Sequence, residues 1–151
     1  ALALGFVTSR VMEAAVIVTG IVSLLAVVTL RQDVAGAPGV DAASLETTGQ
    51  ALVAVRDWTF VYGPDICAGI NALLFGTLLY RSRLVPRWIP SLGLIGAPFF
   101  LAASALAIVG VVEAGSIWFA AVIPVALWEL SVGCYMAFRG FRPSPLTATA
   151  P

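Results

Sequence analysis

Four long apolar runs dominate the sequence, and they limit the possible folds more than any other feature. The first run extends from Phe6 to Leu30 and contains only two charged residues, Arg10 and Glu13. As a helix rising about 1.5 Å per residue it would reach roughly 37 Å, which exceeds the bilayer hydrocarbon thickness of about 30 Å. The first run is therefore predicted to cross a membrane as a tilted helix.

The same argument applied along the chain predicts an all-α, multi-pass transmembrane helical bundle. The predicted spans cover residues of about 6–30, 60–80, 89–112 and 118–138. The second span has two candidate starts, Trp58 and Pro64, because proline is favoured at the first position of a helix. Together the spans form one domain over residues 1–142, and the Pro/Thr/Ala-rich tail at 143–151 is predicted to be disordered.

A shorter helix is predicted between the first two spans, over residues of about 42–57. Asp41 fits its N-cap position, where a carboxylate accepts a hydrogen bond from a free backbone N–H. Leu45, Leu52 and Val55 share one face of this helix, so we expect it to lie on the membrane surface.

Composition supports a membrane protein and excludes several functions. Apolar residues make up 60% of the chain and charged residues 11%, whereas about a quarter of the residues in soluble domains are charged. The net charge is zero and there is no Lys, which argues against a nucleic-acid surface. The absence of His removes the commonest general base and zinc ligand. We therefore expect no enzyme activity, no cofactor and no metal site.

The arginines predict the orientation of the spans. Arg81, Arg83 and Arg87 crowd one short loop, and Arg139 and Arg142 follow the last span. Loops rich in Arg remain in the cytoplasm. A topology of four spans, with both ends of this segment in the cytoplasm, places every Arg-rich loop on the cytoplasmic side.

Polar residues inside the spans are the best candidates for a functional site, because they are costly in a bilayer. Arg10 and Glu13 lie three residues apart on one helical face. Counted from the cytoplasmic ends, Glu13 lies roughly 10 Å deep, and Asn71 and Glu129 each roughly 13 Å deep. These four residues are predicted to form a ligand, ion or proton site, or alternatively a buried group that only orients the helices.

Charge arithmetic at this depth predicts a bound proton. Arg10 is expected to contact Glu13, Glu129 or both, and one arginine offsets only one carboxylate. A second buried carboxylate would then favour its neutral form. Asp65 differs, because it follows Pro64 and would lie in the first turn of a helix, where free N–H groups and the helix dipole stabilise its carboxylate.

Small residues predict where helices pack closely, because small side chains let the backbones of membrane helices approach. Two stripes have this character: Ala15, Thr19 and Ser23 in the first span, and Ala103, Ala107, Gly110 and Ala114 in the third. A bundle of four spans buries little surface between its own helices. We therefore expect contacts with membrane lipid and with either a second copy of the chain or a larger membrane complex.

Three stretches of the sequence resemble one bacterial membrane family, domain of unknown function 4386. They are Ser9 to Ala14, Tyr80 to Pro90, and the set Pro124, Trp128, Glu129, Leu130, Gly140 and Phe141. Members of that family carry further helices upstream, so the chain is similar to the C-terminal two-thirds of a member. The resemblance implies a multi-pass protein of the bacterial cytoplasmic membrane with no assigned activity. The sequence therefore leaves two functions open: binding or moving a small solute, ion or proton, and acting as a non-catalytic scaffold or accessory subunit.

Overall fold

A computed structural model describes residues 1–34, 37–39, 41–112 and 117–143. The described residues are mostly helical and include no strand. Within these residues, four helices are long and apolar enough to cross a membrane by length and composition: Leu2–Gln32, Ala42–Ser82, Trp88–Ile108 and Ala120–Arg139. The predicted all-α fold with four such helices is confirmed. The predicted tail, apart from Pro143, lies outside the described residues.

The N-terminal helix, α1 (Leu2–Thr29), continues through a short π-helical segment, η1 (Leu30–Val34). After the connecting loop, α2 (Ala42–Phe60) begins at Asp41, whose carboxylate accepts a hydrogen bond from the Ser44 backbone N–H at 3.0 Å. This bond satisfies one of the free N–H groups at a helix start. The N-cap predicted at Asp41 is confirmed.

The separate interfacial helix predicted at 42–57 is wrong, because α2 does not end there. It runs through a π-helical segment, η2 (Val61–Cys67), directly into α3 (Ala68–Ser82). Ala42–Ser82 is thus one helix of 41 residues, and neither Trp58 nor Pro64 begins it. Pro64 lacks an N–H and its ring would clash with the carbonyl four residues earlier. The wider π-helical turns relieve that clash without ending the helix.

The second half of the chain forms the hairpin of α4 (Trp88–Ile108) and α5 (Ile117–Arg139). α3 ends at Ser82, and the residue that caps it, Arg83, adopts the left-handed conformation at φ 57° and turns the chain toward α4. α4 ends at Ile108, four residues before the predicted boundary at 112. Gly110, with φ 72°, lies in the turn that follows.

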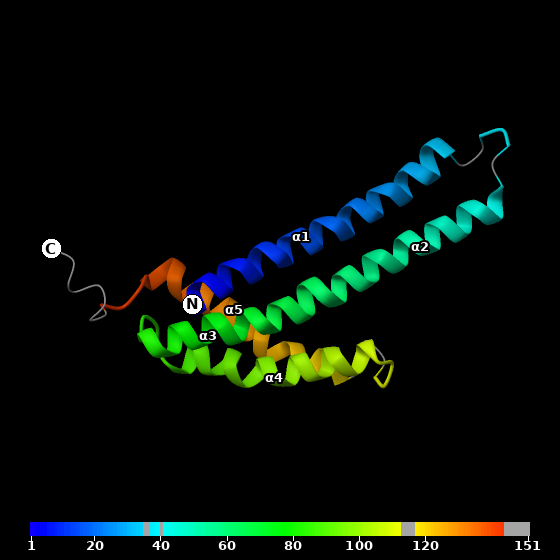
Figure 1. The fold of residues 1–151 in the computed structure, drawn as a ribbon. Helices are drawn as coiled ribbons and strands as arrows, with labels where there is room; N and C mark the ends of the chain where they lie inside the picture. The colour runs from blue at the N-terminus through cyan, green and yellow to red at the C-terminus, as the bar shows by residue number, and fades with distance from the viewer. Residues whose placement is uncertain (35–36, 40, 113–116, 144–151) are drawn as a thin grey trace.

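The helices form two hairpins of unequal length (Figure 1). α1 runs alongside the long α2–α3 helix, and both extend well beyond the shorter α4–α5 hairpin. α4 packs between α3 and α5. The buried core lies where α3, α4 and α5 meet, and its largest fully buried side chains are Trp128, Leu79, Ile89 and Val85.

One end of the bundle gathers the start of α1, the α3–α4 link and the end of α5 (Figure 1). The backbone N–H of Arg142 donates to the Leu84 carbonyl at 2.8 Å, and its guanidinium donates to the Tyr135 hydroxyl at 3.2 Å. Arg87 lies over the Tyr80 ring at 5.0 Å. Arginines far apart in the sequence therefore share this end.

The two stripes of small residues are only partly buried. Ser23 is buried and its hydroxyl donates to the Leu52 carbonyl at 2.6 Å, whereas Ala15 and Thr19 are exposed. Ala103 is buried, Ala107 is half-buried and Gly110 is exposed; Ala114 lies outside the described residues. The buried face of α1 instead consists of Ser9, Glu13, Gly20 and Ser23.

Candidate functional site

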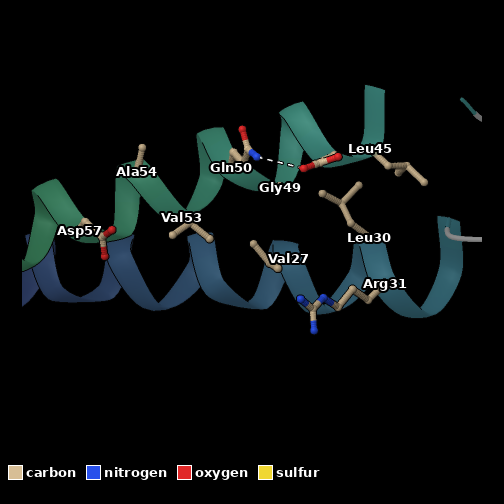
Figure 2. A pocket seen from close by; sticks show the side chains of 10 residues that line it. Val27, Leu30, Arg31, Leu45, Gly49, Gln50, Val53, Ala54 and Asp57 are labelled. Carbon is tan, nitrogen blue, oxygen red and sulfur yellow. Dashed lines mark hydrogen bonds between the residues drawn. The ribbon is translucent and has the colours of Figure 1, made fainter. Parts of the chain in front are cut away.

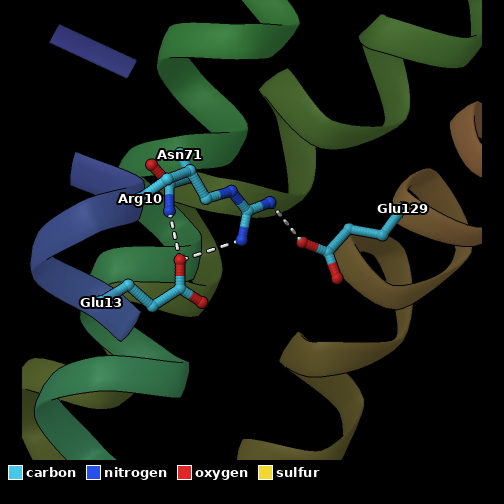
Figure 3. A network of polar contacts seen from close by, with 4 residues as sticks. All are labelled: Arg10, Glu13, Asn71 and Glu129. Atoms are coloured by element: carbon cyan, nitrogen blue, oxygen red, sulfur yellow. Dashed lines mark hydrogen bonds and ion pairs between the residues drawn. The ribbon is translucent and has the colours of Figure 1, made fainter. Parts of the chain in front are cut away.

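Arg10 and Glu13 form an ion pair on the buried side of α1. The Arg10 Nη1 lies 2.9 Å from the Glu13 Oε2, and the two residues are one helical turn apart. The Glu13 side chain is only 11% exposed, whereas that of Arg10 is 41% exposed. Arg10 thus connects a buried carboxylate to the edge of the bundle (Figure 3).

Asn71 reaches the same carboxylate from α3. Its Nδ2 donates to the Glu13 Oε2 at 2.5 Å, and the residue is fully buried. One oxygen of Glu13 therefore accepts hydrogen bonds from both Arg10 and Asn71 (Figure 3). These bonds offset the cost of burying a charged group between two helices.

Glu129 approaches from α5 on the other side of Arg10 (Figure 3). Its Oε1 lies 3.4 Å from the Arg10 Nη2, and its side chain is 44% exposed. The sequence predicts that Arg10 contacts Glu13, Glu129 or both, and in this structure it contacts both. All four residues, Arg10, Glu13, Asn71 and Glu129, form one network across α1, α3 and α5, which we call the polar cluster.

The charges of the polar cluster do not cancel. One guanidinium contacts two carboxylates, which leaves one formal negative charge when both acids are ionised. A proton or a cationic group would balance that charge. The Arg10–Glu129 pair is the exposed part of the cluster, with side chains 41% and 44% exposed.

Aromatic side chains cover one side of the polar cluster, and sequence reasoning missed them. Phe6 stacks on Phe75 with ring centroids 4.7 Å apart, and Phe75 meets Trp128 edge-on at 6.2 Å. The Arg10 guanidinium lies over the Phe6 ring at 5.5 Å. The available signal was helical spacing, because Phe6 precedes Arg10 by one turn and Trp128 adjoins Glu129.

Three buried polar atoms near the cluster have no hydrogen-bond partner among the described residues: Ser9 Oγ, Asn71 Oδ1 and Trp128 Nε1. Ser9 lies one turn before Glu13 on the same buried face. Buried polar atoms in folded proteins are nearly always paired. The cluster therefore has a further capacity to hydrogen-bond water or a small ligand.

Asp65 does not lie at the start of a helix, so its predicted role is wrong. It sits in η2, within the continuous Ala42–Ser82 helix, where the residue is 6% exposed. Among the described residues, its carboxylate makes no hydrogen bond or ion pair. The dipole of a free helix end cannot stabilise it there, because the preceding turns are helical.

An apolar cavity of about 530 Å³ lies elsewhere, between η1 and the distal parts of α1 and α2 (Figure 2). Val27, Leu30 and Val53 line it, with Glu46 and Asp57 at its rim. None of the four residues of the polar cluster contributes to its wall. Within the described part of the chain, no three His, Cys, Asp or Glu side chains gather in a way that could hold a metal ion.

Comparison with known proteins gives one family and no individual relative. No match was found among curated proteins or among solved structures. The family model described as Domain of unknown function (DUF4386) matches residues 1–140. This range includes every helix described above and all four residues of the polar cluster, and the chain therefore belongs to the DUF4386 family.

Proposed function

We propose that this protein is a bacterial multi-pass membrane protein that binds or moves a small solute, ion or proton at the polar cluster. The observation that carries the proposal is the unequal exposure of its two acids. Glu13 is buried and fixed by two donors, whereas Glu129 is nearly half exposed and held by a single contact of 3.4 Å. A fixed inner acid and a loosely held outer acid suit a group that enters from the edge of the bundle.

The cost of charges in a bilayer supports a functional role for the polar cluster. Ionised side chains within membrane helices are expensive, and they commonly line ion or proton pathways. Three helices each contribute polar atoms here, and they do so on one side of an aromatic layer. The cluster has no nucleophile activated by a general base, so we propose binding or movement and no catalysis.

The placement that we propose is the bacterial cytoplasmic membrane, with both ends of this segment in the cytoplasm. The end of the bundle that carries the start of α1 also carries the most arginines: Arg81, Arg83, Arg87, Arg139 and Arg142. The positive-inside rule assigns such an end to the cytoplasm. The polar cluster would then lie nearer the cytoplasmic face.

A second candidate function is a scaffold or accessory subunit in a homo-oligomer or a larger complex. The paired distal parts of α1 and α2 favour it, because they extend past α4 and α5 (Figure 1). Apolar side chains along this extension are exposed, among them Ile21, Leu25, Val28, Val53 and Trp58. Large exposed apolar surfaces mark contacts with lipid or with other proteins.

Two measurements on the same variants separate these functions. Native mass spectrometry of the purified protein would detect any small molecule that remains bound. Liposomes containing the protein and a trapped pH-sensitive dye would report proton entry under an imposed membrane potential. Both are carried out on the wild type, on Glu129→Gln and on Glu46→Gln. Glu46 is the matched control, because it is exposed on α2 and, among the described residues, its carboxylate accepts a hydrogen bond only from Gln50.

We expect wild type and Glu46→Gln to retain a bound molecule or a proton flux that Glu129→Gln loses. Gln keeps the size of Glu129 and mimics its neutral form, so the fold should persist. Identical binding and identical flux in all three proteins would contradict a functional cluster. That result would favour the scaffold.

A further inference from the structure

Asp65 is a buried acid that the polar cluster does not include. Asn71 lies six residues after Asp65, so the two lie about 9 Å apart along the helix axis and on different faces. The residue at position 65 is 6% exposed, and its carboxylate has no partner among the described residues. An ionised carboxylate in such a setting is costly unless a positive charge or hydrogen-bond donors reach it.

The packing of the long helix against α4 indicates what lies beside Asp65. A Cβ at Gly76 would meet Leu94, and a Cβ at Gly69 would meet Leu101. The two helices are therefore antiparallel in a regular register. η2, the segment that contains Asp65, also packs against α4, whose buried residues continue past Leu101 to Ala103 and Ser104. Ser104 is fully buried, and its hydroxyl donates to the Phe100 carbonyl, so its oxygen can still accept.

The backbone around Asp65 supplies further oxygen atoms. Pro64 has no N–H, so one carbonyl in the preceding turn loses its usual helical partner. The residues from Val61 to Cys67 are π-helical, and such wide turns occur often at functional sites. The Ala68 N–H bonds to the Asp65 carbonyl three residues earlier, so that carbonyl is already paired. A carboxylate and a backbone carbonyl that lacks its usual donor thus lie in one π-helical segment that packs against α4.

Charged groups on the neighbouring helices do not neutralise Asp65. α4 contains no charged residue, and α1 contains only Arg10 and Glu13. Arg10 already contacts Glu13 and Glu129. On its own helix the nearest basic residue, Arg56, pairs with Asp57 at 2.9 Å. The charge that balances Asp65 must therefore come from outside these groups.

We propose that Asp65 is the anionic ligand of a second site, which binds one monovalent cation. The cation is either a proton taken from water, which converts the carboxylate to a carboxylic acid, or Na⁺, which would also use backbone carbonyl oxygens of this segment. One carboxylate matches one positive charge. A hard cation such as Na⁺ prefers oxygen ligands of this kind.

Infrared spectroscopy of the full chain with ¹³C-labelled aspartate tests for the proton. At neutral pH the wild type should show a labelled carboxylic-acid C=O band that Asp65→Asn lacks. Asp57→Asn is the matched control, because Asp57 lies on the same helix with a side chain that is 59% exposed. This control should keep the band.

Thermal unfolding tests for Na⁺. The melting temperature of the wild type should rise with added NaCl relative to equal choline chloride, and Asp65→Asn should lose that difference while Asp57→Asn keeps it. If Asp65→Asn does not fold, Asp65→Glu replaces it: a labelled acid band from position 65 should disappear and an unlabelled glutamic-acid band should appear. The proposal is overturned if every labelled aspartate is ionised and Na⁺ and choline act alike.

Discussion

Arg10 is the residue on which the polar cluster depends most. Within the described part of the chain it is the only cation in contact with Glu13 and Glu129, and it connects α1 to α5 through one ion pair. Glu13 has a second donor in Asn71, whereas Glu129 has no other contact within the cluster. Removing Arg10 would therefore leave the buried Glu13 with Asn71 as its remaining donor in the cluster, and Glu129 with no donor in the cluster.

We expect Arg10→Leu to lower the free energy of unfolding by about 2 kcal/mol. Breaking a buried ion pair costs roughly 3–5 kcal/mol, and the partial exposure of Arg10 reduces that cost. Arg56→Leu is the matched control, because its pair with Asp57 is exposed on both sides. This control should lose less than about 1 kcal/mol. Chemical or thermal unfolding in detergent measures both, and equal losses would contradict a structural role for the Arg10 network.

Close contact between α4 and α5 depends on glycines that face aromatic or ring side chains. A Cβ at Gly93 would lie 2.6 Å from the nearest Trp128 ring atom, and one at Gly96 would lie 2.7 Å from Pro124. Trp128 is 1% exposed, so its ring has little room to move. The two helices therefore approach each other only because these positions lack side chains.

Gly93→Ala should consequently destabilise the protein by about 1–3 kcal/mol, the usual cost of overpacking. Gly133→Ala on α5 is the control, since a Cβ there meets no heavy atom within 4 Å. Alanine is also the better helix former, so Gly133→Ala should be neutral or stabilising by up to about 1 kcal/mol. Melting temperatures in one detergent compare the two variants, and a harmless Gly93→Ala would show that this contact is not tight.

The whole molecule has an arginine-rich end and an opposite end where the α1–α2 hairpin turns. If the first end is cytoplasmic, a cysteine at Ser82 should react with an impermeant thiol reagent only from the cytoplasmic side. A cysteine at the exposed Ala42 should react only from outside. The native Cys67 and Cys134 must be replaced first. Labelling of both positions from the same side would contradict this topology.

The sequence by itself determined the helical class, because each apolar run is a local property of consecutive residues. It also predicted that Arg10, Glu13, Asn71 and Glu129 lie at similar depth, since depth follows from counting residues along a helix. It could not predict the aromatic layer of Phe6, Phe75 and Trp128. Those contacts depend on the rotation of each helix about its axis, which packing decides.

Only the tertiary structure decided whether residues 42–82 form one helix or two. The local signals at Pro64 and Asp65 are those of a helix start, and they predicted a break. Packing of α2 and η2 along α1 favours one continuous helix instead; a Cβ at Gly63, for example, would meet Val16. The wide π-helical turns accommodate Pro64 without a break. Because the helix is continuous, Asp65 is buried within it and away from any free helix end.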